Sequence, residues 1–469
     1  MKRENPEPSR LYRWAVLVFV SLAMFGNYYV YDSISPLADL LARQLGFSDA
    51  NIGTLNAIYS VPNIFMVLIG GLIIDRFGTR KSTLLFSTLC FLGAVITALS
   101  SEFWIMASGR LIFGLGAESL IVAITTVLAR WFKGKELSFA FGLNLTIARL
   151  GTFTALNSPT LARSVYSDWQ GPLLISVVAA LVSVISVIIY IILDLKAEKQ
   201  YTMRKEGEVD HVDLKGVFKF NRSFWLITLL CVTFYSAIFP FQTFAVKFFI
   251  QDHFTSLPQD IARSMGGFLS SLLILAAMIL TPLFGLLADK IGKRALLMMV
   301  GSVMLMPVYL ILAYIKVESA IPPATIEAIV ASSDGSSNIR YFFEMIKILF
   351  IYYPNLVIPM AIMGLSFSLI PAVMWPSVAY IVEEKRLGTA YGLMTMIQNI
   401  GLAGFNFIIG VSNDLSHGYT VGMWIFTSLG FFGLVFAWWL HKQETGPEGH
   451  GLELGMAEFG KQVNRSNPQ

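Results

Sequence analysis

The sequence predicts an all-α membrane protein, with twelve transmembrane helices in two pseudo-symmetric six-helix bundles and both termini in the cytoplasm. Three observations support this fold class. Of the 469 residues, 55% are hydrophobic and 14% are charged, whereas soluble domains have about 25% charged residues. Apolar runs long enough to cross a bilayer recur along the chain. A charged loop motif occurs twice, which indicates two related halves.

The repeated motif lies between two apolar runs in each half. Its copies cover residues 71–81 and 285–294, and each has a glycine, three apolar residues, an acid, a base, a second glycine and further bases. Since such charges cannot lie in lipid, each copy predicts a tight loop at a membrane face. We expect these loops to gate the cytoplasmic side, although a plainer interpretation is that they only tie the halves together. The expected gating residues are Asp75, Arg76, Arg80, Asp289 and Arg294.

The first half of the chain contains six apolar segments. The helices predicted there cover about residues 11–31, 51–74, 82–99, 104–128, 137–161 and 172–193. The first segment is long enough to span a bilayer and lacks a small-residue cleavage site, so it indicates an uncleaved helix and not a signal peptide. Residues 1–193 are therefore expected to form the N-terminal bundle.

A polar region and a second set of apolar segments follow. Residues 194–222 are rich in lysine and arginine, which predicts a solvated cytoplasmic linker. Residues 223–440 are expected to form the C-terminal bundle. Five of the helices predicted there cover about residues 224–246, 265–288, 352–381, 387–411 and 421–440. The remaining one, the ninth, ends near residue 315. The polar segment 316–340 indicates an insertion on the outer face, and the polar tail 441–469 is expected to be cytoplasmic and disordered.

Two further patterns indicate the orientation and the internal symmetry. Most loop bases fall on one side of the predicted spans, and the positive-inside rule assigns that side to the cytoplasm. The net charge of +4 therefore needs no nucleic acid to explain it. Residues 137–151 also align without gaps to residues 387–401, which makes the fifth and eleventh predicted helices equivalent.

Few ionisable residues lie within the predicted spans, so each is a candidate for function. Glu118 lies ten residues before residue 128, and Arg149 lies twelve residues after residue 137. At about 1.5 Å per residue, both lie roughly 15–18 Å from the cytoplasmic face, near the midplane. The pair is expected to bind a zwitterion, and a permanent structural ion pair is the alternative. We interpret Arg110 as structural and Asp32 as a helix cap.

Other polar and aromatic residues extend the candidate site. Tyr28 and Tyr235 are expected near mid-depth, Trp375 lies in the tenth predicted helix, and Asn399 takes the place of Arg149 in the second half. The plainer interpretation of any one aromatic residue is packing or interface anchoring. Cys90 and Cys231 fall in apolar runs and indicate small buried hydrophobes without a disulfide. No metal-ligand cluster, phosphate loop or nucleophile constellation occurs, so we expect neither an enzyme, a cofactor nor a metal.

The two loop motifs resemble the loop between helices two and three of the major facilitator superfamily and its weaker copy between helices eight and nine. Residues 109–116 also resemble the superfamily's fourth-helix motif. One branch of the superfamily is similar over part of the tenth and eleventh helices, and Glu118 and Arg149 match that branch in their helix contexts. The similar stretches are residues 374–380, 387–392 and 398–403.

That branch is associated with facilitated dipeptide transport across lysosomal membranes. The resemblance implies a dipeptide uniporter, with Glu118 and Arg149 holding the two charged ends of its substrate. We also expect a monomer that works by alternating access of its two bundles. Two alternatives stay open: a proton-coupled transporter of organic anions or other small metabolites, and a non-transporting membrane scaffold or sensor. The predicted outer loops lack an Asn-x-Ser/Thr triplet and the N-terminal tail lacks an acidic dileucine signal. We therefore expect a bacterial inner membrane rather than a lysosomal one.

Overall fold

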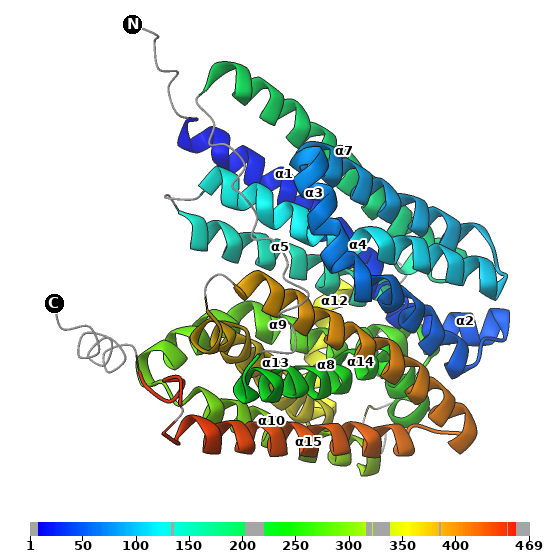
Figure 1. Ribbon diagram of the computed structural model, residues 1–469. Helices are drawn as coiled ribbons and strands as arrows, with labels where there is room; N and C mark the ends of the chain where they lie inside the picture. Colours follow the sequence, from blue (N-terminus) through cyan, green and yellow to red (C-terminus); the bar gives the residue numbers. More distant parts are fainter. Residues whose placement is uncertain are drawn as a thin grey trace, which may run out of the picture. The chain divides into compact units, whose positions relative to one another are not determined.

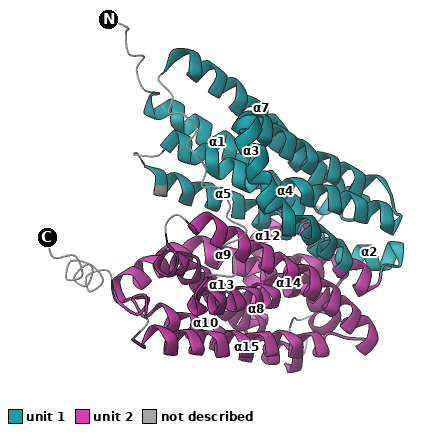
Figure 2. Ribbon diagram, viewed as in Figure 1, with its two compact units in different colours: residues 1–47, 54–158, 162–209 teal, residues 48–53, 159–161, 210–469 magenta. Residues whose placement is uncertain are grey.

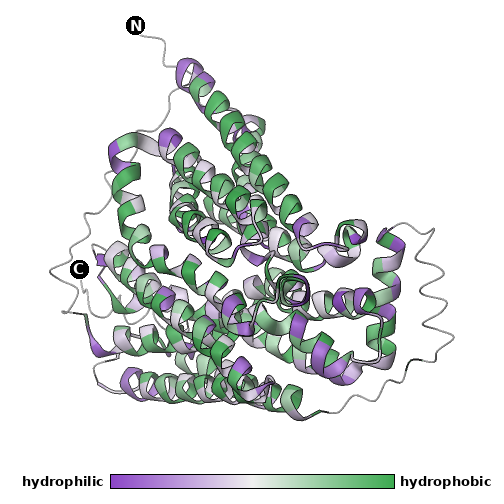
Figure 3. Cartoon of the chain, turned by 90° about the vertical axis from the view of Figure 1, so that its right-hand side faces the viewer, coloured by the Kyte–Doolittle hydropathy of each residue, from purple (hydrophilic) through white to green (hydrophobic). Residues whose placement is uncertain are grey.

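The fold is helical in both of the compact units into which the chain divides (Figures 1 and 2). A computed structural model of the protein describes residues 8–132, 136–201, 220–315, 321, 338–383, 386–447 and 449–455. Unit 1 comprises residues 1–47, 54–158 and 162–209, and unit 2 comprises residues 48–53, 159–161 and 210–469. Hydrophobic residues make up most of the helix bodies, as expected for segments that face lipid (Figure 3).

Unit 1 is built on helices that pack around α1. Its helices are α1 (Arg10–Asp32), α2 (Ala38–Leu45), α3 (Asp49–Leu99), α4 (Phe103–Phe132), α5 (Leu137–Leu156), α6 (Ser158–Leu161) and α7 (Gln170–Gln200), and the unit boundaries cross α3 and α6. Ser9 caps α1, because its hydroxyl accepts a hydrogen bond from the Tyr12 amide at 3.3 Å. α1 packs against α5 and α7.

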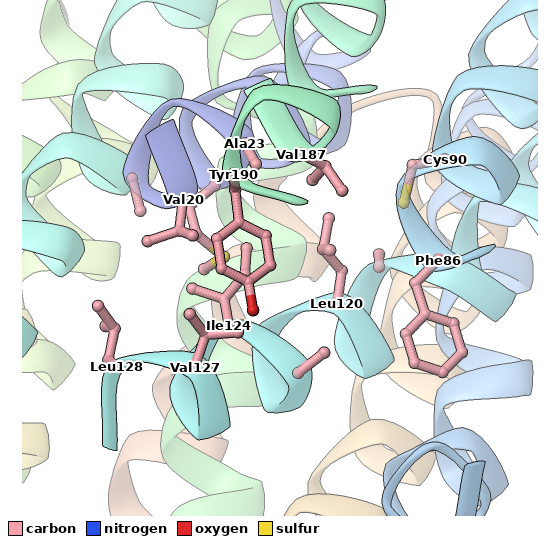
Figure 4. Packing of buried hydrophobic residues seen from close by; sticks show 14 of the residues in the cluster. Val20, Ala23, Phe86, Cys90, Leu120, Ile124, Val127, Leu128, Val187 and Tyr190 are labelled. Carbon is pink, nitrogen blue, oxygen red and sulfur yellow. The ribbon is translucent and has the colours of Figure 1, made fainter. Parts of the chain in front are cut away.

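The core of unit 1 joins α1, α4 and α7 through apolar side chains. Val20 of α1, Leu120 and Ile124 of α4, and Val187 and Tyr190 of α7 lie together in it (Figure 4). Removing such side chains from water or headgroups and packing them densely holds the helices in one arrangement. This arrangement positions the polar residues that the same helices carry.

The repeated motif in unit 1 forms a sharp turn inside α3. Gly78 has φ 76° and ψ 163°, a conformation that is essentially restricted to glycine. A straight helix of 51 residues would be about 77 Å long, against an apolar bilayer core of about 30 Å. Eleven helices of the described chain are long and apolar enough to span a membrane, and α3 counts as one of them. Gly78 divides α3 between the second and third predicted helices.

Unit 2 contains one central helix, α8, in which most side chains are buried. Its helices are α8 (Arg222–Phe248), the π-helix η4 (Phe249–His253), α9 (Gln259–Ile291), α10 (Arg294–Tyr314), α12 (Asn338–Tyr352), α13 (Pro354–Ile381), α14 (Leu387–Ser416) and α15 (Thr420–Glu444). α8 packs against α14 and α15, whereas α13 packs against α9 and α10.

Three segments predicted to be polar connections or tails differ from the sequence predictions. α7 continues to Gln200, seven residues beyond its predicted end at 193, because Asp194 is buried and ion-paired within unit 1. α12 is a helix at the end of the expected insertion, whose residues 316–320 and 322–337 lie outside the described part. The tail was expected to be disordered, but residues 449–455 pack on unit 2 with Leu452 fully buried. Residues 456–469 lie outside the described part.

Candidate functional site

The polar cluster of unit 1 contains the two charges predicted to bind substrate. Glu118 of α4 and Arg149 of α5 are both partly exposed, and these two helices pack against each other. Tyr28 of α1 interacts electrostatically with both side chains. The Glu118 carboxylate also accepts a hydrogen bond from the Tyr59 hydroxyl of α3, at 3.5 Å. Four helices therefore contribute to one cluster, and Tyr59 is the member that the sequence did not indicate.

Asp32 adds a second carboxylate to this cluster. It is the last residue of α1 and accepts a hydrogen bond from the Thr152 hydroxyl of α5 at 2.6 Å. It also interacts electrostatically with Arg110 and Arg149. Ser33 rather than Asp32 holds the C-cap position of α1, and Asp32 instead links the end of α1 to α5.

Arg110 of α4 has the environment of a structural residue. Its side chain is only 1% exposed. The guanidinium donates hydrogen bonds to the carbonyl oxygens of Val30 at 3.0 Å, Tyr31 at 3.2 Å and Leu55 at 3.3 Å, and to the Asn56 side chain at 2.8 Å. These bonds compensate for burying the charge and fasten α1 and α3 to α4. With its donors engaged in this way, Arg110 is poorly placed to bind a substrate.

Unit 2 contains an aromatic cluster that includes two of the predicted site residues. The Trp375 indole of α13 donates a hydrogen bond to the Tyr235 hydroxyl of α8 at 2.9 Å. The Tyr391 hydroxyl of α14 donates to the Trp375 carbonyl at 3.1 Å, and its ring lies 6.0 Å from that of Trp375. Phe239 stacks on Tyr235 with centroids 5.6 Å apart. Tyr391 belongs to the sequence stretch 387–392 but was not among the predicted site residues.

Asn399 of α14 is buried rather than open to solvent. It is 1% exposed, and its amide nitrogen donates to the Thr395 carbonyl of its own helix at 3.0 Å. Its Oδ1 atom has no hydrogen-bond partner in the described part of the chain. A buried acceptor of this kind can receive a donor from a ligand or from water.

The predicted gating residues of unit 1 have two different environments. Arg80 donates to the fully buried Asp194 at 2.5 Å and to the exposed Glu198 at 2.6 Å, both on α7. Arg130 and the Trp131 indole also bond to Asp194, at 3.2 and 3.0 Å. Arg80 thus ties the α3 turn to α7.

Asp75 and Arg76 differ from Arg80 because both are exposed. The Arg76 guanidinium lies 5.5 Å from the centroid of the Phe77 ring. Together with Lys81, which is also exposed, these two charges are the accessible charges of the motif in unit 1.

The second copy of the motif is fastened within unit 2. Arg294 is buried and pairs with Asp289 at 3.0 Å, and it donates to the Tyr380 hydroxyl of α13 at 2.8 Å. It also donates to the Leu454 carbonyl of the tail at 3.3 Å. The tail therefore covers the loop that carries this copy.

A further charged cluster in unit 2 was not predicted from the sequence. Lys247 of α8 forms an ion pair with Asp49, which also accepts a hydrogen bond from Asn413 of α14 at 3.0 Å. The Asp414 carboxylate accepts from the amides of Asp49 and Ala50, each at 2.8 Å, and so caps the first turn of α3. Lys247 follows directly after the predicted helix 224–246, so the only available signal was a base at the end of an apolar run.

Comparisons with known proteins agree in pointing to one family. The family model described as Major Facilitator Superfamily matches residues 20–330 and 255–463. The chain is 34% identical to "Lysosomal dipeptide transporter MFSD1" of Danio rerio over 427 residues, which cover 87% of this chain and 82% of the relative. It is 32% identical to the protein of that name in Homo sapiens over 429 residues, 88% of this chain and 82% of the relative.

Solved structures share the fold at low sequence identity. The nucleoside transporter NupG is 14% identical with a TM-score of 0.65, and the match covers 92% of this chain and 99% of that chain. A bacterial homolog of the human lysosomal transporter Spinster is 16% identical with a TM-score of 0.65, and the match covers 93% of this chain and 98% of that chain. These likenesses concern the fold alone.

Proposed function

Because the chain belongs to the major facilitator superfamily, whose members are transporters and not enzymes, we propose that it carries dipeptides, or zwitterions of similar size, by facilitated alternating access. The single observation that carries this proposal is the cluster in unit 1. It brings an acid and a base, Glu118 and Arg149, onto two packed helices with both side chains partly exposed. The similarity to relatives named as dipeptide transporters supports the same substrate class.

The two charges suit the two ends of a peptide. The planar guanidinium of Arg149 can bind a carboxylate with two parallel hydrogen bonds. The Glu118 carboxylate can accept hydrogen bonds from an ammonium group, and the Tyr28 hydroxyl can bond to either end. The attraction between opposite charges offsets part of the hydration energy that each group loses on binding. A zwitterion therefore fits the cluster better than an ion with a single charge.

The remaining predicted site residues have separate proposed roles. We propose that Tyr235 and Trp375 contact substrate side chains, since their rings offer flat apolar faces with polar edges. Asn399 supplies a buried acceptor with free hydrogen-bonding capacity. In this proposal the protein works as a monomer, and the bacterial inner membrane is its expected location.

Uptake of a labelled dipeptide into proteoliposomes tests the substrate proposal. We expect Glu118→Gln and Arg149→Met each to lower uptake at least about tenfold, because a lost charge-assisted hydrogen bond is worth about 1.5–3 kcal/mol. Glu102→Gln is the matched control, because Glu102 is exposed at the start of the α4 segment, away from the cluster. Wild-type uptake by both cluster variants would refute the binding role.

The exposed loop charges support a separate gating proposal. We propose that Asp75 and Arg76 help to close the cytoplasmic side, whereas Arg80 mainly holds the turn in place. Asp75→Asn is expected to reduce the rate of uptake and to leave equilibrium dipeptide binding unchanged, because Asp75 lies outside the unit 1 cluster. Thermal-shift titration with dipeptide measures binding, and loss of binding in this variant would refute the gating role.

One observation favours a second candidate function. Asp32 is an additional carboxylate that interacts electrostatically with Arg110 and Arg149, and carboxylates within membrane spans commonly carry protons. A proton-coupled transporter of organic anions is therefore the alternative. Facilitated transport and proton coupling differ in whether the substrate can be concentrated.

A further inference from the structure

A cavity of about 360 Å³ lies where α15 ends and α8 begins in unit 2. Its lining includes Trp438, Trp439 and Lys442 of α15, Arg222 of α8, and Gly446 in the turn after α15. Its volume falls within the range of about 300–1,000 Å³ that is usual for small-molecule sites. None of the residues proposed to transport or gate lines it, so this inference does not depend on the proposed function.

The cavity carries positive charge that the described residues do not neutralise. Arg222 is exposed at the first position of α8, whose first turn has no acid. The positive dipole end of α8 meets the negative dipole end of α15 here, so the positive charge of the cavity comes from its two bases. Lys442 is the second base, and no carboxylate is among the described lining residues. The nearby Glu444 is buried and engaged by Ser223 at 2.5 Å and by His450 at 2.7 and 2.9 Å.

The two tryptophans give the cavity an apolar side. Trp438 is 48% exposed and Trp439 is 42% exposed, which is unusual for the largest side chain in a soluble protein. Indole rings prefer the zone between lipid headgroups and acyl chains, where one end is apolar and the other is wet. The Lys442 ammonium lies 5.9 Å from the centroid of the Trp438 ring. A base and an apolar surface are therefore adjacent in this cavity.

We propose that this cavity binds the headgroup of an anionic phospholipid from the adjoining bilayer leaflet. Arg222 and Lys442 donate hydrogen bonds to the lipid phosphate, and the guanidinium can do so with two parallel bonds. The Trp438 and Trp439 rings pack against the glycerol region and the first methylenes of the acyl chains. A soluble phosphate compound would use the two bases but would leave both rings exposed, so a membrane lipid matches the whole lining.

Thermal unfolding of the full chain in neutral detergent tests this site. Phosphatidylglycerol is expected to raise the unfolding midpoint in a saturable manner, whereas phosphatidylcholine and glycerol 3-phosphate are expected to leave it unchanged. Arg222→Gln and Lys442→Gln should each weaken the phosphatidylglycerol effect about fivefold in lipid concentration, from about 1 kcal/mol per base near a membrane surface. Trp438→Leu should weaken it as well.

Lys347→Gln is the control, because Lys347 is an exposed base on α12 that does not line the cavity. It should keep the full lipid effect. Variants are compared only where their midpoint without lipid equals that of the wild type, and native mass spectrometry of lipid-bound wild-type protein provides a test that needs no variant. Equal stabilisation by both lipids, an unchanged effect in both base variants, or full stabilisation by glycerol 3-phosphate would each overturn the proposal.

Discussion

Three arginines of unit 1 show how surroundings assign different roles to one residue type. Arg110 is buried and donates to three carbonyl oxygens and one side-chain oxygen. Arg80 bonds to two carboxylates of α7, one buried and one exposed. Arg149 is partly exposed and interacts electrostatically with Tyr28 and Asp32. Only the last of these has an environment that suits a reversible partner.

The different environments of Arg110 and Arg149 predict different effects of substituting each residue. Arg110→Met removes donors from buried acceptors, and each unsatisfied group costs about 1–3 kcal/mol. We therefore expect a strong fall in the thermal unfolding midpoint and in the yield of folded protein. Arg149→Met is the matched comparison, and we expect it to lower dipeptide uptake with a midpoint close to that of the wild type. A stable Arg110→Met protein that is defective only in uptake would contradict the structural role.

The buried Asp194 shows how one residue can extend a helix beyond the end predicted from composition, in this case α7. Its carboxylate accepts hydrogen bonds from Arg80, Arg130 and Trp131. An unpaired buried carboxylate would be costly, but three donors compensate for its desolvation. The same residue begins a polar run in the sequence, so composition alone placed it in a solvated linker.

At the scale of elements, the tail segment over residues 449–455 completes α10. The first amides of a helix have no partner within it. Here the Lys293 amide donates to the Glu453 carbonyl at 3.1 Å, the Arg294 amide to the Leu452 carbonyl at 3.2 Å, and the Ala295 amide to the Glu453 carboxylate at 3.1 Å. The chain thus uses a distant segment as the cap of a transmembrane helix.

Truncation tests this capping role. A chain that ends at Glu448 loses all three bonds and the buried Leu452 side chain. We expect the free energy of unfolding to fall by at least about 1–2 kcal/mol, the usual cost of a lost cap. Hydrogen exchange should also become faster at the start of α10, because its amides lose their acceptors. A chain that ends at Gly455 retains the segment and serves as the control. Equal exchange at Arg294 and Ala295 in both truncated chains would contradict the proposed cap.

At the scale of the whole molecule, the question is whether transport is coupled to protons. Glu118 and Asp32 are the two carboxylates of the unit 1 cluster. In a facilitated carrier these carboxylates bind substrate or hold helices together, and they do not couple transport to protons. We therefore expect dipeptide to equilibrate across a proteoliposome membrane without accumulating. An imposed pH gradient should leave the final internal concentration equal to the external one.

Accumulation above the external concentration would contradict facilitated transport. The coupled alternative requires that a protonophore abolish this accumulation and that Asp32→Asn do the same. Uptake by Asp32→Asn down a concentration gradient would then persist, which separates a coupling defect from a binding defect. The family membership holds under either outcome, because it rests on similarity along most of the chain.

Much of the fold could be predicted because membrane spans leave local signals. An apolar run of sufficient length can span a bilayer regardless of which helices it packs against. The order of helices in the structure agrees with the order of the predicted segments. The buried state of Cys90 and Cys231 was likewise predicted correctly from their apolar neighbours. The turn at Gly78 was expected from glycine and charge alone, since lipid excludes both irregular backbone and unpaired ions.

The sequence by itself therefore determined the helical class, the family and the short list of ionisable residues within the spans. Only the tertiary structure decided which distant groups meet. Tyr59 bonds to Glu118, and three donors bond to Asp194. Lys247 pairs with Asp49, and the tail bonds to the start of α10. The physical reason is that span formation depends on the composition of one segment. A contact between residues far apart in the chain depends on how each helix is rotated and packed, and no local pattern encodes that rotation.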